Sequence, residues 1–184
     1  MSSRIRTKLY QLKLSKHLLP NELKTRLIVS LILPHVDYCC AAFTDITDQL
    51  DMQLYRALNA CIRFALNVRW GEHITPFYRE LRLLKIDARR RYFVGCLLFN
   101  IICTRQPSLI YSGFTFKSTV TSRATRTSDD ILSLPLCRTE IFRRSFRFSA
   151  SKLWNELPSD IRSARSIGEF KRKLYEHLFN TTLL

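Results

Sequence analysis

The chain has 184 residues, of which 46% are hydrophobic, and carries thirty Lys and Arg against fifteen Asp and Glu, a net charge of +15. The apolar fraction excludes a fully disordered chain, and the length favours one domain or two small helical lobes. The charge favours polyanionic partners, nucleic acid before an acidic membrane; a basic surface that only keeps the protein soluble is the plainer alternative.

The cysteines and the apolar runs indicate a compartment. Six cysteines occur without a CxxC pair, and Cys96 and Cys103 fall in an apolar helical run, where thiols act as small hydrophobic groups. No secretory signal opens the chain, and the apolar runs are too short to span a bilayer. We therefore expect reduced thiols and an intracellular protein, nuclear or cytoplasmic, without a membrane partner.

Prolines divide the first part of the chain into helices. A short helix around Leu9 precedes one that begins at Pro20, a residue whose missing N–H costs nothing at a helix start. Fourfold spacing predicts that Leu23, Leu27 and Leu31 form the buried face of this second helix.

The clearest helix lies within residues 47–71. Thr47 or Asp48 can cap its start, and Gly71 closes it. The predicted buried stripe consists of Leu50, Leu54, Leu58, Cys61, Ile62 and Ala65, with Arg56, Asn59 and Arg63 on the opposite side.

A further helix is predicted to begin with Thr75 and Pro76, before a long apolar one. From Tyr92 to Cys103 the chain is apolar all round, which is typical of a central buried helix. The first turn of that helix carries Arg89, Arg90 and Arg91, and a cation there costs about 0.3–1 kcal/mol when exposed. A bound phosphate would account for the cluster, and so would compensation by Asp87 and a nearby acid.

A loop-rich segment is predicted next, with a mobile loop over about 112–135, because residues 117–130 are rich in Ser, Thr and Arg and have no apolar period. The alternation in "RSFRFS" (144–149) predicts a short extended piece. Its arginines can neutralise phosphates while its phenylalanines either stack on bases or point into the core.

Three helices are predicted to close the chain, the first in "SKLWNEL" (151–157) and the second in "SDIRSA" (159–164). The last begins with a capping box formed by Ser166 and Glu169. Its predicted buried face consists of Ile167, Phe170, Leu174 and Leu178, and Lys171, Arg172 and Lys173 are expected to face water or a partner.

The chain offers no catalytic constellation. Asp129–Asp130 lie in a polar segment without a third carboxylate nearby, so we expect no divalent-metal site. Ser149 and Lys152 match S-x-x-K, but the companion motifs are missing. His35 with Cys39 and Cys40 lacks a second ligand pair, and no phosphate-binding glycine loop occurs. We expect no cofactor, no metal and no small-molecule substrate.

Three segments resemble the carboxyl-terminal part of non-LTR, LINE-type (jockey/CR1-like) retrotransposon reverse transcriptases. They are "LPNELKTRLIVSLILPHVDYC" (19–39), "LYRALNACIRFALNV" (54–68) and "RRSFRFSASKLWNELPSDIRSARSIGEFKRKLYEHL" (143–178), in the family's order. The resemblance places this chain after the palm of an RNA-directed DNA polymerase. It implies a thumb-like helical bundle over 1–72 and a carboxyl-terminal helical lobe with a basic tail over 73–184. The aromatic-x-Asp-Asp motif of the family's palm is absent, so the catalytic activity is not carried over.

We therefore expect a mainly α fold and a non-catalytic fragment that grips template and primer, or element RNA, through phosphate contacts. The expected partners are RNA or DNA and the palm domain of the parent polymerase. The alternative is a structural or protein-interaction remnant without a selected nucleic-acid function. The predicted phosphate contacts are Arg89, Arg90, Arg91, Arg143, Arg144, Arg147, Lys171, Arg172 and Lys173.

Overall fold

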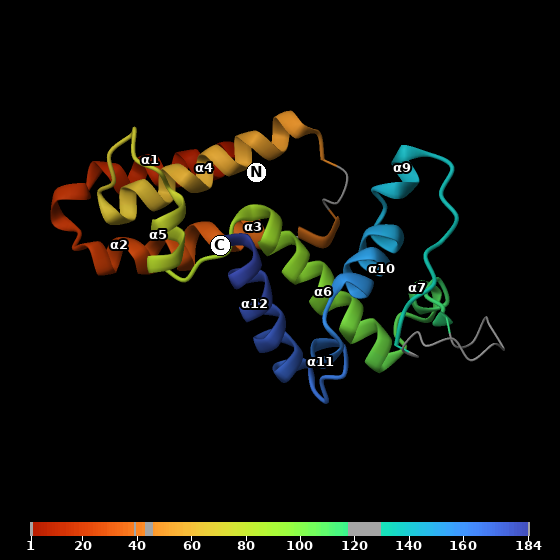
Figure 1. Ribbon diagram of the computed structural model, residues 1–184. Helices are drawn as coiled ribbons and strands as arrows, with labels where there is room; N and C mark the ends of the chain where they lie inside the picture. The colour runs from red at the N-terminus through yellow and green to blue at the C-terminus, as the bar shows by residue number, and fades with distance from the viewer. Residues whose placement is uncertain (1, 39, 43–45, 118–129, 184) are drawn as a thin grey trace. The chain divides into compact units, whose positions relative to one another are not determined.

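The structure is a computed structural model that describes residues 2–38, 40–42, 46–117 and 130–183 (Figure 1). The described part is mainly helical, which confirms the expected fold class. It forms two compact units: one comprises Met1–Cys40, Ile46–Arg89 and Phe179–Leu184, and the other comprises Ala41–Asp45 and Arg90–Leu178. The sequence-based boundary lies between 72 and 73, whereas the units divide inside helix α6 (Ile86–Thr104).

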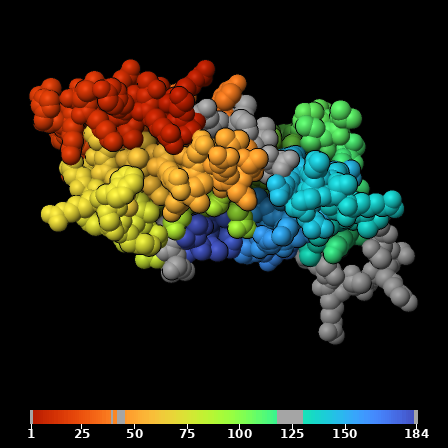
Figure 2. Space-filling view, turned by 90° about the horizontal axis from the view of Figure 1, so that it is seen from above, coloured from red at the N-terminus to blue at the C-terminus, as the bar shows by residue number. Residues whose placement is uncertain are grey.

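The first unit contains five short and long α-helices. They are α1 (Ser2–Leu14), α2 (Asn21–Leu27), α3 (Leu33–Asp37), α4 (Asp48–Leu66) and α5 (Thr75–Glu80), with a 3-10 turn η1 (Lys16–Leu18) and a π-helical turn η2 (Ile28–Ile32). The 3-10 turn η3 (Cys40–Ala42) is divided between the two units. Figure 2 shows the red surface of α1 lying directly against the orange and yellow surface of α4 and the residues after it. This pairing of α1 with α4 positions a hollow of about 870 Å³.

Helix α4 supplies much of the first unit's core, as its apolar period predicts. Leu58, Cys61, Ile62 and Ala65 are buried, and the Thr47 side chain caps the helix by accepting a hydrogen bond from the Leu50 backbone N–H (3.4 Å). Leu50 itself is 50% exposed, so the predicted stripe is wrong in its first turn. A residue one turn into a helix lies at the edge of the packed interface and gains little burial.

The predicted buried face of α2 is wrong by one residue. Leu23 and Leu31 are exposed, and the buried row is Lys24, Ile28 and Ile32. Both rows have fourfold spacing, so the sequence period fits either face. Packing against α4 selects the second row and buries a lysine in it, and that cation needs polar partners.

Lys24 finds its partners at the end of α4. Its Nζ donates to Asn21 Oδ1 and Asn67 Oδ1, both at 3.2 Å, and lies 5.7 Å from the centroid of the Phe64 ring. Asn67 ends α4 with a left-handed backbone (φ 54°), a conformation that Asn tolerates better than most residues. The lysine thus ties the start of α2 to the end of α4.

The second unit is built on α6 and on the helices after it. These are α7 (Ser108–Tyr111), α9 (Glu140–Arg143), α10 (Phe146–Glu156), α11 (Ser159–Arg162) and α12 (Ile167–Leu183), of which α6 and α12 each have one end in the first unit. Phe99 stacks on Phe170 with centroids 4.2 Å apart, and Phe170 stacks on Trp154 at 6.1 Å. Three aromatic rings from α6, α10 and α12 therefore form the centre of this core.

Gly95 permits the close approach of α6 and α12. A Cβ at this position would stand 2.8 Å from Leu174 Cδ2, closer than carbon atoms pack. Phe170, Leu174 and Leu178 are buried as predicted, whereas Ile167 is 38% exposed, so the predicted face of α12 is wrong in its first residue. One half of the predicted capping box is confirmed, because the Glu169 N–H donates to Ser166 Oγ (3.2 Å), whereas the Glu169 carboxylate accepts from the Arg165 N–H (3.0 Å).

Two residues of the "SKLWNEL" motif, Trp154 and Asn155, bind the segment around Leu132, which lies more than twenty residues earlier in the chain. The Asn155 side chain accepts from the Leu132 N–H and donates to the Leu132 carbonyl, both at 2.9 Å, and Trp154 Nε1 donates to the Asp130 carbonyl (2.7 Å). Leu132 also forms an isolated antiparallel bridge with Phe116. Of the mobile loop predicted over about 112–135, residues 118–129 lie outside the described residues, and both flanks are tied by these bonds.

The predicted extended piece at residues 144–149 is wrong. Helix α9 ends at Arg143, and α10 begins at Phe146, with Ser145 as its cap: Ser145 Oγ accepts from the Phe148 N–H (3.5 Å). The helical form lets α10 bury Leu153 and Trp154 on one face, which a two-residue alternation does not allow.

Candidate nucleic-acid interface

The first of the predicted arginines is used inside the first unit. Arg89 forms a two-pronged ion pair with Asp37 of α3: its Nε donates to Oδ1, and its Nη2 donates to Oδ2 at 2.7 Å. The Arg89 side chain is only 14% exposed. A nearby acid, Asp37, therefore compensates Arg89, in line with the second of the two expected explanations, and Arg89 is not placed to reach a phosphate.

Three of the other predicted arginines meet at one hollow of the second unit. Arg90 and Arg91 come from the first turns of α6, and Arg143 comes from the end of α9, more than fifty residues later. We call this the α6–α10 hollow; it has a volume of about 450 Å³ and is lined by Arg90, Arg91, Val94, Arg143, Phe148, Ser149, Lys152, Leu153 and Glu156.

Carboxylates compensate several cations of the α6–α10 hollow. Arg91 Nη2 lies 2.8 Å from Glu156 Oε2, and Lys152 Nζ lies 4.0 Å from Glu156 Oε1. Outside the lining, Glu140 pairs with Arg143 and with Arg144, each at 3.4 Å. An incoming phosphate must compete with these carboxylates for the same guanidinium groups.

The remaining predicted residues lie outside that hollow. Lys173 is paired with Glu169 (2.9 Å) and also donates to the Asp160 carbonyl (2.9 Å). The hydrogen bond from Lys173, joined by one from the Arg165 backbone, lowers the pKa of the Glu169 carboxyl. Lys171 lines a separate hollow of about 340 Å³.

Of the last two predicted residues, Arg147 lies beside Gly113, and Arg172 is exposed on α12. The structure therefore does not gather the nine predicted residues into one surface.

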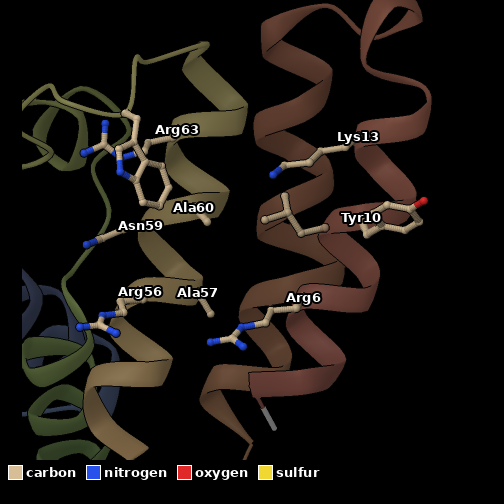
Figure 3. Close-up of a pocket in the computed structure, with 10 residues that line it drawn as sticks. Arg6, Tyr10, Lys13, Arg56, Ala57, Asn59, Ala60 and Arg63 are labelled. Atoms are coloured by element: carbon tan, nitrogen blue, oxygen red, sulfur yellow. The ribbon is translucent and has the colours of Figure 1, made fainter. Parts of the chain in front are cut away.

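Another hollow lies in the first unit, where no phosphate contact was predicted except Arg89. We call it the α1–α4 groove; its volume is about 870 Å³. It is lined by Arg6, Leu9, Tyr10 and Lys13 of α1, by Arg56, Ala57, Asn59, Ala60 and Arg63 of α4, and by Trp70 (Figure 3).

Small residues open the α1–α4 groove. Figure 3 shows Ala57 and Ala60 projecting from α4 toward α1, and Arg6 and Lys13 extending from α1 toward them. Because two alanines one turn apart fill little of the space between helices, a hollow remains above them. Arg6 and Lys13 are seven residues apart, which is about 10 Å along a helix axis, and so are Arg56 and Arg63.

The α1–α4 groove is cationic without compensation. Its lining contains four cations and no carboxylate. Among the described residues, the side chains of Arg6, Lys13 and Arg56 form no ion pair and no hydrogen bond. Their charge is therefore directed to the solvent or to a ligand, in contrast to the paired arginines of the second unit.

Arg63, the fourth cation, organises the aromatic border of the groove. Its guanidinium donates to the Arg69 carbonyl and to the Glu72 carbonyl (2.6 Å for the latter) and lies 5.8 Å from the centroid of the Trp70 ring. Trp70 is 86% exposed, and Tyr10 on the α1 border is 63% exposed. Two aromatic side chains thus stand at the edges of a cationic groove.

Sequence reasoning missed this groove, although part of its signal was visible. The period of α4 placed Arg56 and Arg63 together on its polar side, and the seven-residue spacing of Arg6 and Lys13 is the matching sign on α1. Only the tertiary packing of α1 on α4 joins the two rows.

The thiols and carboxylates of the described residues do not converge. No group of three or more His, Cys, Asp and Glu side chains among these residues is placed to hold a metal ion; Cys39 and Asp129 lie outside them. Burial raises the pKa of Cys61 to about 12 and that of Cys96 to about 11, so these two thiols are protonated at neutral pH.

No family model, curated protein or solved structure matches this chain. Within the described part of the chain, every helix is too short or too polar to cross a membrane.

Proposed function

We propose that this chain binds RNA or DNA through phosphate contacts and carries out no catalysis of its own. The observation that carries the proposal is the α1–α4 groove, whose lining contains four cations and no carboxylate. Arg and Lys neutralise phosphates and release counterions, which supplies most of the affinity of non-specific nucleic-acid binding. The net charge of +15 adds long-range attraction of the same sign.

The α6–α10 hollow supports the proposal as a secondary contact. It brings Arg90, Arg91 and Arg143 together, as a shared phosphate-binding role requires, but Glu156 and Glu140 reduce its charge. We assign it the weaker contribution to affinity for that reason.

We further propose that the chain is the carboxyl-terminal, thumb and post-thumb part of a non-LTR retrotransposon reverse transcriptase. The three motifs at 19–39, 54–68 and 143–178 support this origin. The genomic sequence upstream of the codon for Met1 tests it: an open frame that encodes an aromatic-x-Asp-Asp palm motif is expected there, and an upstream sequence without one would contradict the proposed origin.

The proposed binding is tested by measuring affinity for RNA and DNA over a range of salt concentrations. Because each neutralised phosphate makes the slope of log K against log salt more negative by about 0.7–0.9, we expect a slope of about −3 from the four cations of the α1–α4 groove. A slope near zero would overturn the proposal. A primer-extension assay with magnesium and with manganese tests the proposal that the chain carries out no catalysis, and no extension is expected.

A protein-interaction function is the second candidate, favoured by apolar side chains that stand in solvent. In the second unit Leu136 is 99% exposed, Leu109 86% and Ile141 77%. A palm domain or a second copy of the chain that covered them would shift the sedimentation coefficient of the purified protein. A concentration-independent monomer that does not bind a palm domain would rule this candidate out.

A further inference from the structure

The α1–α4 groove carries more than charge, because aromatic surface stands on both of its borders. Trp70 and Tyr10 are among the most exposed large side chains of the first unit, and a water-exposed indole is costly unless something covers it. One face of Trp70 is turned to the Arg63 guanidinium, which leaves an open face for a second planar group. Flat aromatic faces beside cations are the means by which proteins bind unpaired bases.

The structure holds Trp70 in place before any ligand arrives. Arg63 grips the turn that carries the indole through the carbonyls of Arg69 and Glu72. The Glu72 carboxylate accepts from the Arg69 N–H (3.2 Å), and the Glu72 N–H donates back to the Arg69 carbonyl (3.3 Å). These four bonds fix the backbone of the turn that carries Trp70, so less of that backbone has to be ordered when a ligand binds, which favours affinity.

The cationic path continues past Trp70. A second hollow of about 350 Å³ shares Lys13, Ala60, Arg63 and Trp70 with the groove and adds Lys16. Trp70 therefore lines both hollows, so a strand bound to the cations of the two hollows could contact the indole.

We propose that the α1–α4 groove binds a short single-stranded segment of RNA or DNA, with its phosphates on Arg6, Lys13 and Arg56 and one base stacked on Trp70. The inference rests on the proposed nucleic-acid function and narrows it to unpaired strands. A duplex keeps its bases stacked on one another, so it can use the cations but not the indole. An acidic peptide likewise satisfies the cations and leaves the open face of Trp70 unused.

The test compares a short oligouridylate with an RNA duplex of equal length, using the full chain. Because stacking one base is worth about 1–3 kcal/mol, Trp70→Ala is expected to weaken single-strand binding about tenfold and duplex binding less than twofold. Trp70→Phe keeps a flat ring and should restore most of the loss. Tyr38→Ala is the matched control, because Tyr38 is 74% exposed in the same unit and does not line the groove.

Arg63→Lys separates positioning from charge. Lysine keeps the cation but cannot bridge two carbonyls and cover the indole at once. We expect weaker single-strand binding, an unchanged salt slope, and a Trp70 fluorescence anisotropy that falls in the free protein. Trp154, the only other tryptophan, is buried and reports whether the second unit stays folded.

Different results would overturn the stacking inference and the proposed nucleic-acid function. Salt-dependent binding that ignores Trp70→Ala, or an equal loss for duplex and single strand, overturns the stacking inference and leaves the proposed function standing. The stacking inference is also overturned if polyglutamate competes for the bound oligouridylate as effectively as unlabelled oligouridylate does. No salt-dependent binding of either nucleic acid overturns the proposed function itself. Quenching of Trp70 emission by oligouridylate and not by the duplex supports the inference independently of any variant.

Discussion

The two cationic hollows contain the same number of Arg and Lys side chains and differ in what surrounds them. The α1–α4 groove has four cations with no carboxylate in its lining, whereas the α6–α10 hollow has four with Glu156 among them and Glu140 beside Arg143. A carboxylate also compensates a cation in α12, where Glu169 forms an ion pair with Lys173. A count of arginines therefore overstates the second unit as an anion site, because the local acids decide how much charge remains for a ligand.

The largest expected effect comes from removing three cations from each hollow. Arg6→Gln/Lys13→Gln/Arg56→Gln and Arg90→Gln/Arg143→Gln/Lys152→Gln change the net charge equally. In about 50 mM salt we expect a loss of RNA affinity of about a hundredfold for the first variant and less than about tenfold for the second. Fluorescence anisotropy titrations measure both. Equal losses would mean that the overall field of the protein, rather than the groove, binds the ligand.

A second variant tests whether Arg89 is structural. Asp37→Asn leaves a mostly buried guanidinium without its carboxylate, which should lower the free energy of unfolding by about 2 kcal/mol. Urea denaturation measures the change. Glu156→Gln removes the partner of the half-exposed Arg91 and should cost less than about 1 kcal/mol. If the two variants were equally stable, Arg89 would be as available to a ligand as Arg91.

Glu156→Gln is also expected to change the affinity of the α6–α10 hollow for RNA. Removing this carboxylate releases Arg91 and Lys152, so RNA affinity should rise about two- to fivefold at low salt. Glu80→Gln changes the net charge by the same amount on an exposed residue of α5 and serves as the control. A rise no larger than that of the control would show that the carboxylate does not limit the hollow.

The smallest expected effect concerns Glu169 and Lys173. Because the pKa of Glu169 is lowered in the folded state, its carboxylate stabilises the fold above its ordinary pKa of 4.5, and that stabilisation is lost as the pH falls through the lower folded value. Glu169→Gln should therefore lower the melting temperature slightly at pH 7, and the difference should vanish in acid. Glu22→Gln, on an exposed residue of α2, is the control. A difference that persists in acid would point to the cap rather than the charge.

Local signals in the amino-acid order were sufficient for several long helices and for two of their caps. Thr47 and Ser166 cap their helices as predicted, because a cap needs only a side-chain oxygen and an N–H three residues later. The buried positions Phe170, Leu174 and Leu178 follow from a period of about 3.6 residues along a long helix. The mainly α fold follows from the same period.

Only the tertiary structure decides which face of a helix is buried and which distant residue a side chain contacts, because the sequence is compatible with more than one choice. The face of α2 has two apolar rows, and packing on α4 buries the one that contains Lys24. The partner of Arg89 lies fifty-two positions away at Asp37, and the α1–α4 groove joins two cationic rows about fifty residues apart. Periodicity describes one element at a time, so it cannot tell which element lies opposite. The composition determines the net charge of this protein. The packing of the helices determines which cations have no carboxylate beside them.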